Sequence, residues 1–445
     1  MDRRAFLLSA GALAAAPLDF ARGRSAHAAA MPAGAGLQGA RANFPIAARQ
    51  TYLNSAAIHP MGLHASRALE QHVAFRLHGA GEGRADFDDA KQRDLKRRFA
   101  ALVNAKPTEI AFVQNTSDGE NIVVMGMDLA RKGGNVVLDE LHFTSSLFMY
   151  KSLEAKGLEL RVVKHRDWAI DIRDMDRAID RNTRLVSLAL VSNVNGYLHD
   201  AKAVSDLAHA RGAYVYADMV QAVGAVPVDV RAMGIDFAAT ATYKWLMGER
   251  GFGFLYVRED LQDTVVPTTR YGHRQVAAFD RVGLTWEPLP GAARYETGTF
   301  PSALAVCAHE SLRYIEALGL ANIRSHAREL TARLQAELPR AGYPSLTPAA
   351  NETPIVAFQL RDAGETAKRL KAGNVTATII AAEKRLRLRG HGLRTRFSAL
   401  PRCKARVRGF VWADVDGEGV PDAVLLDETG TVRTFLNLRG GEFRE

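Results

Sequence analysis

Short apolar runs alternate with segments of helical periodicity from about residue 47 onward. Apolar runs of strand length predict β-strands at 135–140, 158–165, 184–192, 213–218 and 252–257. Between them, segments 145–157 and 201–212 repeat apolar residues at helical spacing and end in glycine. Strands that alternate with helices predict an α/β fold whose mostly parallel sheet is covered on both faces. Ligands in such sheets bind at the carboxyl ends of the strands.

A smaller α+β region is expected after the sheet. Helical periodicity runs from about 302 to 341, and strands are predicted at 354–360 and 375–380. We therefore expect a large domain at 47–295 and a small domain at 296–389, to which the N-terminal segment 29–60 contributes. A chain of 445 residues is long enough for this division.

Composition is that of an ordinary soluble globular protein, with 47% hydrophobic and 24% charged residues. The formal charge of +9 is concentrated, because residues 384–408 hold ten Lys or Arg and no acid. The remainder of the chain is close to neutral, so the charge does not predict a nucleic-acid partner.

The N-terminus has the pattern of an export signal. Arg3 and Arg4 precede Phe6 and an Ala/Leu run that is too short for a permanent membrane span. This pattern resembles a twin-arginine signal peptide at residues 1–28 and predicts a periplasmic protein that folds before export. A disordered or membrane-anchoring N-terminus is the alternative. The two cysteines of the chain predict no disulfide framework.

Polar residues stand at the ends of several predicted strands. Thr116 and Ser117 begin a helix predicted at about 117–132, where they form either a phosphate site or an ordinary N-cap. Asp218 ends a buried strand, and there it either caps a helix or holds a protonated ring nitrogen. Asn193 and Phe143 stand at two further strand ends, where a turn cap and a core ring are the simpler interpretations.

Lys244 lies in a stretch of small and apolar residues, IDFAATATYKWLMG. Lysine is a poor choice for a buried strand unless its amine has a partner or a chemical role. The residue is therefore the strongest candidate for chemistry in the chain.

From about residue 51 to 388 the chain resembles the class V aminotransferase family of pyridoxal-phosphate enzymes, which includes isopenicillin-N epimerases and cysteine desulfurases. The specific part is the block 216–257, with Asp218, Gln221 and Lys244 in the order and spacing of the family. The resemblance implies a three-layer fold of the fold-type I transferase kind. It also implies that Lys244 forms the Schiff base with pyridoxal phosphate and moves the proton at the substrate α-carbon.

The resemblance assigns the other cofactor contacts as well. Asp218 would pair with the pyridine nitrogen, and Gln221 and Asn193 would hydrogen-bond the phenolic oxygen of the ring. Phe143 would stack on the ring, with His142 as the alternative. The phosphate would be held by Thr116, Ser117 and Tyr243. The family often has Ser or His just before the lysine, whereas this chain has Ala241, Thr242 and Tyr243.

Three more segments resemble family motifs. YETGTFPS, with Gly298 and Thr299, resembles the segment that reaches the cofactor phosphate of the neighbouring subunit, which implies a homodimer with shared active sites. KRLRLRGHG places Arg387 where the family grips the substrate α-carboxylate, although Arg387 is otherwise one member of a solvated basic run. YLNSAAIHP, with Asn54 and Ala56, resembles the N-terminal lining of the substrate pocket.

The type of reaction stays open at this stage. A cysteine desulfurase needs a mobile nucleophilic cysteine shortly before the carboxylate-binding strand, and segment 374–384 has none. An aminotransferase, an epimerase and a β-lyase all remain compatible with the motifs. The motifs resemble those of the epimerase-like branch most.

The C-terminus departs from the family. A basic linker at 390–409 precedes residues 410–445, which resemble one VCBS/FG-GAP repeat. Four acidic residues at loop positions 1, 3, 5 and 9 suit Ca²⁺, and an acidic hairpin turn without metal is the alternative; they are Asp414, Asp416, Glu418 and Asp422. One repeat cannot close a propeller, so the tail is a fusion, a truncation or a frameshift product. The rival function is a catalytically impaired, calcium-dependent extracytoplasmic binding protein.

Overall fold

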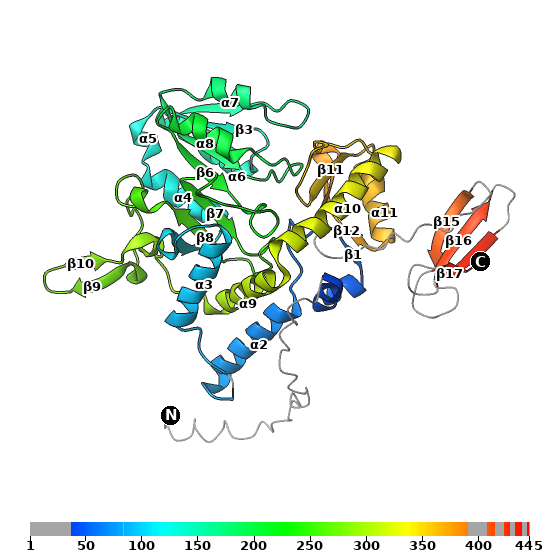
Figure 1. Cartoon of the computed structure of the whole chain (residues 1–445), viewed down its shortest axis with the longest axis horizontal. Helices are drawn as coiled ribbons and strands as arrows, with labels where there is room; N and C mark the ends of the chain where they lie inside the picture. The colour runs from blue at the N-terminus through cyan, green and yellow to red at the C-terminus, as the bar shows by residue number, and fades with distance from the viewer. Residues whose placement is uncertain are drawn as a thin grey trace, which may run out of the picture. The chain divides into compact units, whose positions relative to one another are not determined.

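The computed structural model describes residues 37–82 and 84–389 and, for the C-terminal part, the backbone of strands within 407–444. Seven strands form the central sheet in the order β2-β8-β7-β6-β5-β3-β4 (Figure 1). The strands from β7 to β4 pair in parallel, whereas β8 runs antiparallel to both β7 and β2. The predicted α/β class with a mostly parallel sheet is therefore confirmed. The strands are β2 (Ile110–Val113), β3 (Asn135–Asp139), β4 (Glu159–Val163), β5 (Thr183–Ala189), β6 (Tyr214–Asp218), β7 (Phe237–Ala241) and β8 (Gly253–Val257).

The helices of this region pack against the sheet and form its core. Helix α4 packs on β7 and β8, α8 packs on β5 and β6, and α3 packs on β2. The rings of Phe99 on α3 and Phe254 on β8 are stacked with centroids 3.9 Å apart. The helices are α2 (Leu63–His78), α3 (Asp89–Leu102), α4 (Thr116–Gly126), α5 (Leu129–Lys132), α6 (Thr144–Leu153), α7 (Ile172–Ala178) and α8 (Ala201–His209).

The structure corrects one expectation about the helices. The helix expected at 117–132 is interrupted, because Asp128 takes a left-handed backbone conformation with φ of 54° between α4 and α5. The helices expected within 302–341 are confirmed as α9 (Ser302–Leu318) and α10 (Leu320–Arg340), separated by Gly319 with φ of 77°. Glycine adopts such a conformation without steric cost.

A three-stranded antiparallel sheet forms the smaller α+β region. Its order is β11 (Ile355–Gln359), β14 (Arg385–Arg389), β13 (Thr378–Ile380), and α10 and α11 (Ala363–Ala372) pack beside it. Side chains alternate along β14, so that Leu386 and Leu388 enter an apolar core. Arg385 and Arg387 therefore belong to the opposite face of the strand.

The N-terminal segment pairs with the same region. Strand β1 (Thr51–Tyr52) lies parallel to β12 (Val375–Thr376), with Thr51 opposite Val375. The Leu53 backbone N–H continues the pairing by donating to the Thr376 carbonyl at 2.8 Å. The N-terminal segment is thus joined to the small α+β region through backbone hydrogen bonds.

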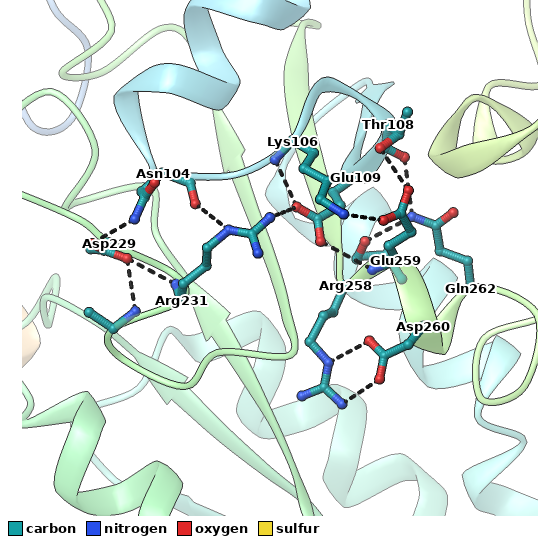
Figure 2. A network of polar contacts seen from close by, with 12 residues as sticks. Asn104, Lys106, Thr108, Glu109, Asp229, Arg231, Arg258, Glu259, Asp260 and Gln262 are labelled. Carbon is teal, nitrogen blue, oxygen red and sulfur yellow. Dashed lines mark hydrogen bonds and ion pairs between the residues drawn. The ribbon is translucent and has the colours of Figure 1, made fainter.

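A polar network fastens the amino end of β7 and its neighbours, away from the strand ends that carry the predicted site (Figure 2). The buried Glu109 carboxylate accepts hydrogen bonds from the Arg231 guanidinium at 2.8 Å and from the Lys106 backbone N–H at 2.7 Å. It also accepts from the Glu259 backbone N–H at 3.2 Å. This carboxylate ties the start of β2 to the end of β8.

A hairpin and a separate tail complete the described chain. The hairpin of β9 (Val276–Asp280) and β10 (Thr285–Pro288) exposes apolar side chains, and Val282 at its turn is 95% exposed. The tail strands form one antiparallel sheet. They are β15 (Val407–Ala413), β16 (Asp422–Asp427), β17 (Val432–Asn437) and β18 (Phe443–Arg444). Within the described part of the chain, no helix combines the length and apolarity that membrane crossing requires.

Candidate active site

Lys244 lies in the turn that follows β7, three residues beyond the last residue of the strand. Its side chain is buried, with the residue only 7% exposed. Burial lowers the pKa of its amine to about 8, the nearby Asp218 opposes this shift, and Arg387 adds to it. A buried amine with this pKa has a much larger neutral fraction near neutral pH than an ordinary lysine, and the neutral amine is the form that attacks a carbonyl group.

Asp218 ends β6, the strand next to β7 in the sheet, and it is buried. Its carboxylate accepts a 2.9 Å hydrogen bond from the Val220 backbone N–H. Burial raises the pKa of Asp218, while this hydrogen bond and the charge of Lys244 oppose the rise. The sheet register thus brings the predicted acid and the predicted lysine together as a buried pair.

Gln221 lies beneath the same turn and makes two contacts within the protein. Its amide N–H donates to the Ala56 carbonyl at 3.1 Å, and its amide oxygen accepts from the Trp245 indole at 2.9 Å. The N-terminal segment also reaches the residue before the lysine, because the His59 backbone N–H donates to the Tyr243 carbonyl at 2.9 Å. Asn54 lies in the same segment and accepts a hydrogen bond from the Thr378 hydroxyl.

The N-terminus of α4 faces this region because the helix approaches β7 closely. A Cβ added to Gly119 would lie 2.6 Å from the Ala239 side chain, so glycine is needed for this contact. Thr116 is the first helical residue, and the Ser117 hydroxyl lies 3.4 Å from the Ser145 hydroxyl. The first N–H groups of a helix have no intrahelical partner and attract anions.

Phe143 and His142 take different positions at the end of β3. The Phe143 ring is 38% exposed, and its centroid lies 5.9 Å from the Lys244 Nζ atom. The His142 ring is buried, with its two nitrogens hydrogen-bonded to the Ser187 hydroxyl and the Phe143 backbone N–H. This arrangement favours Phe143 over His142 as the ring that would lie against a cofactor. The Tyr243 ring lies 5.6 Å from Lys244 Nζ.

Arg387 enters the site from β14. Its guanidinium is buried, and one terminal N–H donates to the Asn193 carbonyl. Burial and, to a smaller extent, the charge of Arg385 lower its pKa to about 9. Within residues 37–82 and 84–389, no carboxylate forms an ion pair with Arg387, and its Nε atom has no hydrogen-bond partner. A buried cation of this kind is poised for an anionic ligand.

Gly298 and Thr299 lie apart from these residues in one chain. They line a cavity of about 340 Å³ whose other lining residues include Asp118 and Arg270 of the same chain. Neither Lys244 nor Arg387 lines it. The structure therefore leaves their expected contact to a neighbouring subunit untested.

The structure does not test the predicted calcium ligands. Asp414, Asp416, Glu418 and Cys403 fall outside the described residues, and for Asp422 only its place at the start of β16 is described. Among the residues that are described, no group of three His, Cys, Asp or Glu could hold a metal ion. Cys307 is buried in α9, and burial raises the pKa of its thiol to about 11.

Sequence reasoning did not single out two residues of the site. Trp245 follows the lysine and orients Gln221, and Glu120 lies buried one turn below Ser117 in α4. An acidic residue on the inward face of a helix with apolar neighbours at 122–124 was a usable signal for Glu120.

Comparison with known proteins agrees with this geometry. A model of the aminotransferase class-V family matches residues 80–375. A probable cysteine desulfurase of Methanothermobacter thermautotrophicus is 32% identical over 302 residues, which cover 66% of this chain and 74% of the relative. A cysteine desulfurase of Escherichia coli is 29% identical over 337 residues, which cover 72% and 82%.

Solved structures share the fold at low identity. An apo cysteine desulfurase from Thermococcus onnurineus matches with a TM-score of 0.72 and 23% identity over 80% of this chain and 93% of that one. The cystine C-S lyase C-DES, in complex with its product cysteine persulfide, matches with a TM-score of 0.67 and 19% identity over 78% and 95%. Because the family model spans well over half of the chain, including all seven strands of the central sheet, the chain belongs to the aminotransferase class-V family.

Proposed function

We propose that this protein is a pyridoxal-phosphate-dependent enzyme that acts at the α-carbon of an amino-acid-like substrate. The observation that carries the proposal is the buried Lys244 amine, whose pKa is lowered to about 8 beside a buried carboxylate and a buried guanidinium. Lysines with such a pKa are suited to covalent attachment to an aldehyde. The lysine is the covalent anchor of the cofactor in this proposal.

The neighbouring residues fit the cofactor group by group. Asp218 supplies a buried anion for a ring nitrogen, and the exposed Phe143 ring offers a stacking face. Thr116, Ser117 and Tyr243 are the proposed phosphate contacts, while Gln221 and Asn193 are the proposed partners of the ring oxygen. When bound, pyridoxal phosphate supplies the electron sink that makes the α-carbon acidic.

The side chains of the protein perform the remaining work. A Lys244 pKa of about 8 lets the amine both accept and return a proton near neutral pH. The planar fork of Arg387 matches a carboxylate, and its Nε–H is a donor without a partner among the described residues. Arg387 would thereby orient the substrate so that its α-hydrogen faces the amine. Asn54 and Ala56 would line the substrate pocket.

Aminotransfer or epimerisation is the reaction we propose first. β-Elimination at a carbon–sulfur bond is a second candidate, favoured by the desulfurase names of the relatives. A persulfide route through Cys307 is not supported, because its thiol is buried with a pKa of about 11 and therefore stays protonated. A catalytically impaired, calcium-dependent binding protein remains the rival from another class.

Covalent capture of the cofactor tests the proposal. Purified protein incubated with pyridoxal phosphate should show the absorption band of the bound cofactor, and borohydride reduction should fix the mass of the cofactor on the Lys244 peptide. Lys244→Ala should abolish the labelled peptide. Absence of labelling in the wild-type chain, or labelling at another lysine, would rule the proposal out.

A panel of L- and D-amino acids would then identify the reaction. Keto-acid release indicates aminotransfer, loss of optical rotation indicates epimerisation, and pyruvate with sulfide indicates β-elimination. Calorimetry with Ca²⁺ on the wild type and on Asp416→Ala tests the rival, since equal heats would remove the case for a metal in the tail.

We also propose a homodimer and export to the periplasm. Gly298 and Thr299 support the dimer, because in one chain they line a cavity that Lys244 does not share. The twin arginine at Arg3 and Arg4 supports export. Cell fractionation of the wild type and of a double Lys substitution at these arginines tests export, since equal periplasmic amounts would contradict it.

A further inference from the structure

Glu120 is a buried carboxylate with three hydroxyl donors. It lies on α4 and is 3% exposed. Its oxygens accept hydrogen bonds from Ser146 at 2.7 Å, from Tyr150 at 3.1 Å and from Ser187 at 3.2 Å. Burying a carboxylate is costly compared with an apolar side chain of the same volume, so packing alone does not account for this residue.

The hydrogen bonds from His142 to Glu120 form a relay that runs in one direction: His142 donates to Ser187, and Ser187 donates to Glu120. The Phe143 backbone N–H donates to His142 Nδ1 at 2.7 Å, so this nitrogen carries no proton. In a neutral imidazole the proton then lies on Nε2, which donates to the Ser187 hydroxyl at 3.1 Å. The single proton of Ser187 is left to donate to Glu120. Burial lowers the His142 pKa to about 4, which keeps the ring neutral.

This relay ends at the candidate site. Phe143 is the N-cap residue of α6, and its ring lies 5.9 Å from Lys244 Nζ. Ser146 and Tyr150 of the same helix also donate to Glu120. One carboxylate on the helix that begins with Thr116 therefore holds the helix that begins beside the stacking ring.

We propose that Glu120 is a positioning residue, which acts through Ser187 and His142 to fix the backbone and ring of Phe143 against the cofactor. The inference rests on the proposed function for the identity of the cofactor. The relay itself belongs to the protein, because every bond in it joins residues of this chain. Its integrity is therefore measurable without any ligand.

Ser187→Ala and Ser146→Ala form a matched pair of test variants. Both remove one hydroxyl from the same carboxylate, but only Ser187 joins Glu120 to His142, whose ring accepts the Phe143 backbone N–H. We expect Ser187→Ala to raise the dissociation constant for pyridoxal phosphate about tenfold and to weaken its induced circular dichroism, because a hydrogen bond linked to a charged group is lost. Ser146→Ala should change both by no more than about twofold, since the relay is intact.

A readout on the cofactor-free protein separates this proposal from the proposed function. ¹⁵N NMR of the imidazole should show His142 as the Nε2–H tautomer in all three proteins. The Nε2 resonance should move in Ser187→Ala alone, because only there does the Nε2–H group lose its acceptor. Glu120→Gln removes the negative charge at the end of the relay while keeping an acceptor for Ser187, and Glu109→Gln is its control, because Glu109 is a buried carboxylate outside this path.

Each outcome has one meaning. Equal effects of Ser187→Ala and Ser146→Ala on affinity, dichroism and the His142 Nε2 resonance would overturn the role of Glu120. A wild type that shows the Nε2–H tautomer but binds no pyridoxal phosphate would overturn the proposed function and, with it, the cofactor end of this inference. A wild type that shows the Nδ1–H tautomer would overturn the relay directly.

Discussion

The Trp245 indole donates a 2.9 Å hydrogen bond to the Gln221 amide oxygen, on the residue that directly follows the candidate lysine. The other end of the amide donates to the Ala56 carbonyl. The orientation of Gln221 is therefore fixed from both sides, because exchanging its oxygen and nitrogen would place donor against donor and acceptor against acceptor.

Replacement of Trp245 by Phe should destabilise the fold by about 1–3 kcal/mol, because a buried amide oxygen loses its donor and the smaller ring leaves a void. Urea denaturation of the apo-protein measures this. Trp286→Phe, on the exposed hairpin, is the control and should change the free energy of unfolding little. Equal losses in the two variants would show that the Trp245–Gln221 bond contributes nothing.

Replacement of Arg387 by Met should raise the pKa of Lys244 above about 8, because the charge of Arg387 is one cause of the lowered value. The rate at which the apo-protein captures pyridoxal phosphate rises with pH as the amine loses its proton. The midpoint of that profile should therefore move upward. Arg250→Met removes an exposed cation as a control. A midpoint that stays or falls in Arg387→Met would contradict the prediction.

Replacement of Glu120 by Gln should change how stability depends on pH. Burial raises the folded-state pKa of Glu120 to about 7 from its ordinary 4.5. Between these values the folded chain binds more protons than the unfolded chain, so Glu120 lowers the free energy of unfolding as pH rises through this window. The difference between wild type and Glu120→Gln should therefore decline from pH 4.5 to 7 and then level off. If the difference in the free energy of unfolding between the two proteins stays constant from pH 4.5 to 7, the prediction is wrong.

Mixing two inactive variants should restore activity if the active site is shared between subunits. Lys244→Ala removes the anchor, and Gly298→Trp blocks the proposed contact with the neighbouring phosphate. A Cβ at Gly298 meets nothing within 4 Å in its own chain, so the second variant should fold. Hybrid dimers carry one site with both defects and one intact site, which predicts up to a quarter of the wild-type activity in an equal mixture. Persistent inactivity after subunit exchange would count against shared sites.

The sequence singled out the polar residues at the strand ends more clearly than the strands that carry them. Asp218 and Lys244 were recognisable because a polar residue at the end of an apolar run is informative wherever strands are parallel. Strand β7 was missed, since three of the five residues of FAATA are alanine, which is depleted in strands. Its small side chains make room for α4, as the close approach of Gly119 to Ala239 shows.

Tertiary partners could not be predicted. Nothing local to Glu120 indicates that Ser146 and Ser187, from two other elements, converge on its carboxylate. The burial of His142, which leaves Phe143 half-exposed, likewise depends on a hydrogen bond between His142 and Ser187, 45 residues away in sequence. Such contacts depend on the register of β5 against β3 and β6, which periodicity does not fix.

The pairing of β1 with β12 has a consequence for how the chain matures. Strand β1 emerges early in synthesis, yet its partner lies near the end of the enzyme fold. Closing so long a loop is slow, so the segment that carries Asn54 and Ala56 stays undocked until nearly the whole fold has been made. A nascent or truncated chain lacking β12 would therefore hold its lysine in an unfinished pocket, and competence for chemistry would arrive only with the last strands.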